Sequence, residues 1–104
     1  MTKVILGKEK VKELYDQDVF EGYDFEHNGE KYIFVEESDV YMDDDGKSYT
    51  YIYKRESDNK YFEVTISYAR YGYEDYEFES WLNDGEMYEV EKHEKVITYW
   101  KKVK

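Results

Sequence analysis

The side chains in this sequence that could do chemistry are mainly carboxylates and tyrosines. The chain of 104 residues holds 26 Asp and Glu against 15 Lys and Arg, and it also holds 14 Tyr. A pair of carboxyl groups can serve as acid and base at a glycosidic bond. Nothing in the sequence marks one such pair, so we predict no catalytic residue and do not expect an enzyme.

Motifs for metals and cofactors fail on their spacing. Residues 43–46 read Asp-Asp-Asp-Gly, but with this glycine at the sixth position of an EF-hand loop, Tyr41 and Ile52 would take the ends. Those ends must be Asp and Glu, so we predict a turn. His27 and His93 lie far apart, and we expect each to be a surface or sheet-packing residue. The chain has no Cys, which excludes thiolate metal sites and disulfides. We predict no metal and no cofactor.

Charge is segregated along the chain. Residues 1–12 carry a net charge of +3, residues 13–91 carry −18 and residues 92–104 carry +4. Self-repulsion among these charges opposes compaction. The net charge of −11 also exceeds the magnitude of about 2–8 that keeps a small domain soluble. The excess therefore favours a basic partner. Direct binding of nucleic acid is disfavoured, because phosphate contacts need a clustered positive surface.

Many of the acids stand two residues apart in segments that alternate like strands. Side chains two apart on a strand share a face at about 6.5–7 Å, a spacing comparable to that of successive phosphates on a nucleic-acid strand. An alternative is that these acids form the solvated face of a half-buried sheet and protect its edges. The pairs are Asp24 and Glu26, Glu37 and Asp39, Glu77 and Glu79, and Glu89 and Glu91.

The elements that must position these residues are one short helix and a series of strands. Residues 8–16 have helical spacing, residues 4–6 form a short strand or a hydrophobic staple, and alternation with a period of two begins at residue 23. Turn residues at 28–29, 43–46, 57–60 and 83–85 separate the strands. The last segment, residues 87–102, is strand-like with a bend near 91–94.

The sequence predicts one acidic, Tyr-rich domain over residues 1–104. Its fold class is α+β, mainly β, with an antiparallel sheet of five or six strands and one short N-terminal helix. Tyrosines should supply much of the core, because their rings can be buried while the hydroxyls find hydrogen bonds. No apolar run approaches the length of a membrane span, so we expect no membrane partner and a cytoplasmic location.

In style, the chain resembles small acidic proteins encoded by bacteriophages, including inhibitors that imitate DNA and some anti-CRISPR proteins. The features behind this resemblance are the Lys-rich start, the Asp/Glu/Tyr-rich hairpin at 36–53, and the tail at 88–100. The resemblance implies a stoichiometric inhibitor of a host nucleic-acid-binding or defence protein, acting in the host cytoplasm. It assigns no functional residue.

We therefore predict a non-catalytic acidic protein that binds and inhibits a nucleic-acid-binding or defence protein by occupying its basic surface. An alternative is an adaptor or structural protein that binds through an aromatic surface around 71–81, or forms a homodimer through a sheet edge. Core packing is the other explanation for those aromatic residues. The candidate partner-binding residues are Glu36, Glu37, Asp39, Asp43, Asp44, Asp45, Tyr73, Glu74, Asp75, Glu77, Glu79 and Trp81.

Overall fold

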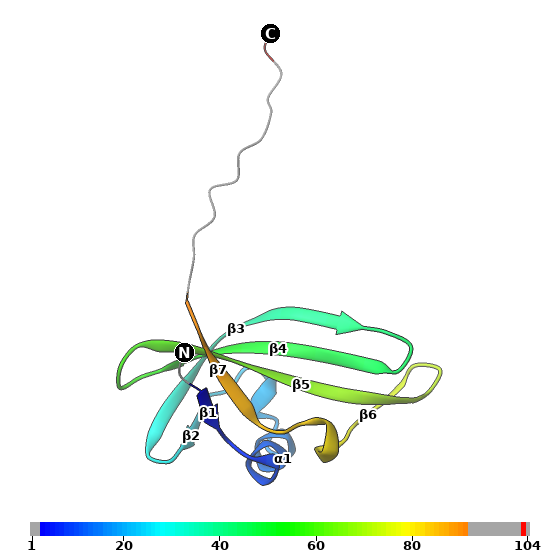
Figure 1. The fold of residues 1–104 in the computed structure, drawn as a ribbon, viewed down its shortest axis with the longest axis horizontal. Coiled ribbons are helices and arrows are strands. Elements are labelled where there is room, and N and C mark those ends of the chain that lie inside the picture. The colour runs from blue at the N-terminus through cyan, green and yellow to red at the C-terminus, as the bar shows by residue number, and fades with distance from the viewer. Residues whose placement is uncertain (1–2, 92–102, 104) are drawn as a thin grey trace.

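A curled antiparallel sheet forms most of the molecule. The computed structural model describes residues 3–91 and residue 103. Seven strands make a half-barrel, and one helix packs against it (Figure 1). The predicted fold class is confirmed, with one or two strands more than expected. Among the described residues, no helix has the length and apolar character needed to cross a membrane.

The strands follow the order β1-β7-β5-β4-β3-β2, and β6 pairs with the far end of β5. Figure 1 shows β3, β4 and β5 as the long central strands of this sheet. The elements are β1 (Lys3–Ile5), α1 (Lys8–Asp16), the 3-10 turn η1 (Val19–Glu21), β2 (Phe25–His27), β3 (Glu30–Met42), β4 (Gly46–Arg55), β5 (Lys60–Gly72), β6 (Asp75–Phe78), the 3-10 turn η2 (Ser80–Leu82) and β7 (Glu86–Val90).

The helix occupies the range that its periodicity predicts. Val11 and Leu14 are buried against the sheet, one helical turn apart. On the exposed side, Lys12 Nζ forms an ion pair with Asp16 Oδ1 at 2.6 Å. The amphipathic pattern therefore directs one face of α1 into the core.

Most turns and strand ends lie where the sequence predicts them. Asn28 and Gly29 both have positive φ, at 52° and 76°, as a tight hairpin turn requires. Residues 3–5 are a strand that pairs with β7, which decides between the two interpretations of this segment. Of the strand predicted at 87–102, β7 covers the residues up to Val90, and residues 92–102 lie outside the described part of the chain.

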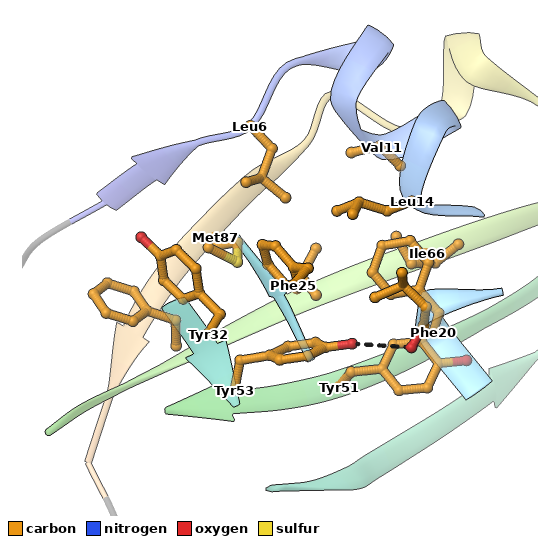
Figure 2. Packing of buried hydrophobic residues seen from close by; sticks show 13 residues of the cluster. Leu6, Val11, Leu14, Phe20, Phe25, Tyr32, Tyr51, Tyr53, Ile66 and Met87 are labelled. Carbon is orange, nitrogen blue, oxygen red and sulfur yellow. Dashed lines mark hydrogen bonds between the residues drawn. The ribbon is translucent and has the colours of Figure 1, made fainter. Parts of the chain in front are cut away.

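The core lies between the helix and the concave face of the sheet, and tyrosines are part of it (Figure 2). Tyr32, Tyr51 and Tyr53 are buried together with Phe62 and Ile66. The hydroxyl of Tyr53 donates a hydrogen bond to the carbonyl of Val19 at 3.5 Å, and burial raises the pKa of this phenol. The prediction of a tyrosine-containing core is confirmed.

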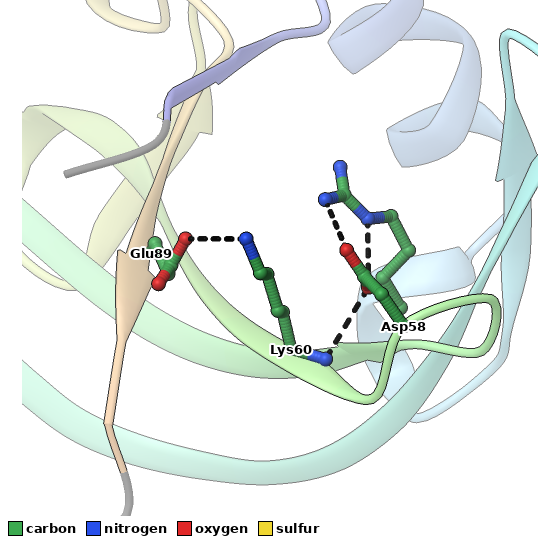
Figure 3. A network of polar contacts seen from close by, with 4 residues as sticks. Asp58, Lys60 and Glu89 are labelled. Atoms are coloured by element: carbon green, nitrogen blue, oxygen red, sulfur yellow. Dashed lines mark hydrogen bonds and ion pairs between the residues drawn. The ribbon is translucent and has the colours of Figure 1, made fainter.

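Three polar contacts support the sheet in addition to the hydrogen bonds between its strands. His27 Nε2 lies 3.1 Å from the carbonyl oxygen of Ile5, which joins β2 to β1, the two outermost strands of the order. His27 is thus a sheet-packing residue, as one of the two sequence interpretations expected. At the β4–β5 turn, Arg55 binds Asp58, and Lys60 Nζ reaches Glu89 Oε1 on β7 at 3.6 Å (Figure 3).

Candidate functional site

Seven of the predicted carboxylates lie at one end of the sheet. They belong to the β3–β4 turn, the β5–β6 turn, β6 and the residue that follows it. The backbone N–H of Arg70 on β5 donates a hydrogen bond to the carbonyl of Asp45 at 2.9 Å, which joins the two turn regions. We call this surface the acidic tip: Asp43, Asp44, Asp45, Glu74, Asp75, Glu77 and Glu79.

The turn at residues 43–46 is built by its first carboxylate. Asp43 Oδ1 accepts hydrogen bonds from the backbone N–H of Asp45 at 2.9 Å and of Gly46 at 3.0 Å. Position 46 requires glycine, because a Cβ there would lie 2.1 Å from the carbonyl oxygen of Tyr68. Within the described residues, no group of three or more Asp, Glu or His side chains is arranged to hold a metal ion.

Aromatic side chains are interleaved with the acids of the tip. Glu79 accepts hydrogen bonds from the Tyr71 hydroxyl at 2.8 Å and from Trp81 Nε1 at 3.1 Å, and this bond to a carboxylate raises the pKa of Tyr71. Tyr73 and Trp81 are 87% and 64% exposed. These residues therefore form surface, not core, whereas Tyr76 is half-buried.

Two bases beside the acidic tip are held by internal contacts. Lys47 Nζ lies over three tyrosine rings, 4.5 Å from the centroid of Tyr76, 5.3 Å from that of Tyr49 and 5.6 Å from that of Tyr68. Arg70 Nε donates a hydrogen bond to the carbonyl of Gly72 at 3.1 Å. We call the three rings around Lys47 the tyrosine cage. A cation among them is held by the negative faces of the rings.

A buried asparagine positions the loop that carries Glu79 and Trp81. The side chain of Asn83 is 2% exposed. Its Nδ2 donates to the carbonyls of Ser67 at 3.0 Å and Glu79 at 2.9 Å, and its Oδ1 accepts from the Ser67 N–H at 2.7 Å. Along this edge of β5, β7 pairs with residues 61–64 and β6 with residues 68–72. Asn83 forms hydrogen bonds with the backbone of Ser67, in the part of β5 between the residues paired with β7 and those paired with β6.

The three candidate residues on β3 do not share one face. The register places Glu36 opposite Ile52, Glu37 opposite Tyr51 and Asp39 opposite Thr50, with irregularities on both sides of Glu37. Tyr51 faces the core, so Glu37 lies on the concave face while Glu36 and Asp39 lie on the outer one. The expectation that Glu37 and Asp39 share a face is wrong, because a bulge adds a residue between them.

In the other acidic pairs spaced two residues apart, the two members do not both lie within one regular strand. In each pair one residue falls just outside the strand: Asp24 precedes β2, Glu79 follows β6 and Glu91 follows β7. A regular phosphate-like spacing along one strand is therefore not how this surface is organised. The acids gather at the acidic tip because turns from neighbouring strands meet there.

A cavity on the concave face was not anticipated from the sequence. It has a volume of about 310 Å³ and lies between the end of α1, η1 and strands β4 and β5. Aromatic rings and carboxylates line it together: Tyr15, Asp16, Asp18, Phe20, Glu21, Tyr51 and Tyr68. The sequence contains the alternating tyrosines of β4, but no local pattern relates them to the acids after α1.

Comparison of this chain with protein-family models, with curated proteins and with solved structures finds no match. The resemblance to acidic bacteriophage inhibitors therefore stays a prediction.

Proposed function

We propose that this protein is a non-catalytic acidic inhibitor, which occupies the basic surface of a nucleic-acid-binding or defence protein in the manner of a DNA mimic. The observation that carries the proposal is the acidic tip. Carboxylates from two turns and from β6 project at one end of the sheet, and two bases beside them, Lys47 and Arg70, are engaged within the fold.

Electrostatics make such a surface suited to a basic partner. A concentrated negative field steers association with a positively charged surface and raises the association rate. The same field repels nucleic acid, which agrees with a partner that is a protein. Tyr71, Tyr73 and Trp81 add aromatic contact area beside the charges, and aromatic residues are enriched among those that dominate binding energy.

The first experiment is a pull-down from bacterial lysate with two matched variants. A tip variant carries Asp44→Asn, Asp45→Asn, Asp75→Asn and Glu77→Gln. It retains Asp43 and Glu79, whose carboxylates hold the turn and the aromatic side chains. A change in capture can then be assigned to charge and not to the loss of these contacts.

The control variant loses the same number of charges elsewhere on the described surface, through Glu9→Gln, Glu26→Gln, Glu30→Gln and Glu56→Gln. We expect the wild type and the control variant to capture the same basic protein at about 50 mM salt and to release it near 500 mM, because salt screens the attraction. The tip variant should not capture it. Capture by all three proteins at both salt concentrations would refute the proposal.

A second candidate function, an adaptor or a homodimer, is favoured by two specific observations. Tyr73 and Trp81 are exposed. In addition, β2 pairs only with residues 30–32 of β3, so the rest of this edge has no second strand partner within the described residues. An unpaired edge is a template for another chain, although bulges and charges of the kind found here oppose such pairing.

The two candidates respond in opposite ways to the same substitutions. If the aromatic surface dominates, Tyr73→Ala or Trp81→Ala abolishes partner binding and the tip variant retains it. If charge dominates, the tip variant loses binding and the alanine variants weaken it less. Sedimentation equilibrium decides on the homodimer, since pairing through the β3 edge would double the mass in solution.

A further inference from the structure

The concave cavity is lined by aromatic rings and by carboxylates together. Tyr51 and Tyr68 line it from the sheet, and Phe20 stacks on Tyr51 with the ring centroids 5.7 Å apart. The ring of Tyr15 meets that of Tyr68 edge to face at 6.0 Å. At about 310 Å³, the cavity is at the small end of the range of about 300–1,000 Å³ for ligand sites. It suits a single side chain.

The charges around the cavity are negative. Asp16, Asp18 and Glu21 line it and are exposed to solvent. Lys12 pairs with Asp16, but among the described residues no ion pair or side-chain hydrogen bond engages Asp18 or Glu21. Helix α1 ends at Asp16 with no basic residue in its last turn, so the partial negative charge of its carbonyls adds to the field.

The same face already holds one cation against tyrosine rings. Lys47 occupies the tyrosine cage, and Tyr68 is shared, since its ring contacts Lys47 and also lines the cavity. Burial, followed by the charge of Glu37, raises the pKa of Tyr51 to about 12. This phenol is therefore neutral at physiological pH, and its ring can face a cation without being ionised itself.

We propose that the concave cavity binds one arginine side chain of the basic partner, with the guanidinium over the rings of Tyr51 and Tyr68 and paired with Asp18 and Glu21. Arginine fits better than lysine, because its planar guanidinium stacks on aromatic rings and is more weakly hydrated than an ammonium group. The assignment of this arginine to the basic partner rests on the proposed function. The assignment of the cavity as a guanidinium site does not depend on it.

The test uses the intact protein and two small probes. N-acetyl-arginine methylamide carries the guanidinium, and the corresponding citrulline derivative has nearly the same shape without the charge. We expect the arginine probe to shift the ring-proton NMR signals of Tyr15, Tyr51 and Tyr68 in a saturable way, and the citrulline probe to leave them unchanged. Equal shifts with both probes, or none with either, would overturn the proposal.

Two variants assign the binding to the cavity. Asp18→Asn with Glu21→Gln should weaken it by about tenfold, the upper range for two exposed ion pairs. Asparagine suits position 18, where φ is 58°, because it tolerates the left-handed region. Lys47→Met removes a competing cation beside Tyr68 and should strengthen binding, a gain that loss of folding cannot produce. Weaker or unchanged binding of the arginine probe in Lys47→Met would count against the cavity as its binding site.

The tip variant separates this proposal from the proposed function. It should bind the arginine probe like the wild type, because the four residues that it changes do not line the cavity. If the cavity binds the probe while no basic protein depends on the acidic tip, the proposed function fails alone. If a partner depends on the tip but the probe leaves Tyr51 and Tyr68 unaffected, the cavity proposal fails alone.

Discussion

Replacing Asn83 with Ala removes three hydrogen bonds, two that tie the loop after β6 to the middle of β5 and one that lies within that loop. The substitution leaves the backbone N–H and C=O of Ser67 and the carbonyl of Glu79 without this partner. The side chain is almost fully buried, so water does not replace it freely. The loop that carries Glu79 and Trp81 should then separate from β5.

The cost follows from those three bonds. Each contributes about 0.5–1.5 kcal/mol net, so the free energy of unfolding should fall by about 2–4 kcal/mol. For a domain of this size, 1 kcal/mol corresponds to about 4–8 °C, which predicts a fall in Tm of about 8–32 °C. Asp84→Ala is the matched control. It removes one exposed hydrogen bond, from the N–H of Glu86 at 3.2 Å, and should cost about 0.5 kcal/mol.

Urea denaturation followed by circular dichroism measures the loss, and native-state hydrogen exchange locates it. The amide proton of Ser67 should lose protection in Asn83→Ala and keep it in Asp84→Ala. A loss below about 1 kcal/mol, with the Ser67 amide still protected, would refute the role of Asn83 as a partner for β5.

Four further outcomes are expected. Gly46→Ala should lower stability by about 1–3 kcal/mol in urea denaturation, because its Cβ would meet the Tyr68 carbonyl at 2.1 Å. Since the pKa of Tyr51 is raised to about 12, folding favours its protonated form, and Tm should fall as pH rises above about 10, less so in Tyr51→Phe. Arg55 lowers the pKa of Asp58 to about 2, so the Tm advantage of wild type over Asp58→Asn should vanish as pH falls from about 4 to 2. At pH 8, added NaCl should raise Tm by screening the acidic surface, and a fall would indicate that ion pairs stabilise the fold.

The elements of this fold could be predicted from the sequence because local signals agree with tertiary packing. Residues 8–16 combine helical periodicity with Val11 and Leu14 on one face, and both are buried. Alternation of Phe62, Val64 and Ile66 likewise identifies the buried face of β5. The curl of the sheet, the β1–β2 contact through His27 and the two bulges of β3 depend on long-range register, which no local pattern encodes.

The candidate site was predictable in composition and less so in geometry. The turn residues at 43–46 identify one acidic loop, whereas the turn at Glu74 has no such prediction, and only the strand pairing brings the two loops to one end of the sheet. The sequence assigns Asn83 to a turn, and only the tertiary structure gives it a role as a hydrogen-bonding partner of β5. The cavity joins residues after α1 to Tyr51 and Tyr68 across the core, a contact between segments far apart in the chain.

Displacement of DNA decides whether the acidic tip takes the place of nucleic acid on a basic protein. Fluorescently labelled DNA is bound to the basic protein recovered in the pull-down, and its anisotropy is followed while this protein is added. We predict that wild type and control variant release the DNA stoichiometrically and that the tip variant does not. Retention of the DNA in a ternary complex, or equal release by the tip variant, would show that the acidic tip does not occupy the DNA-binding surface.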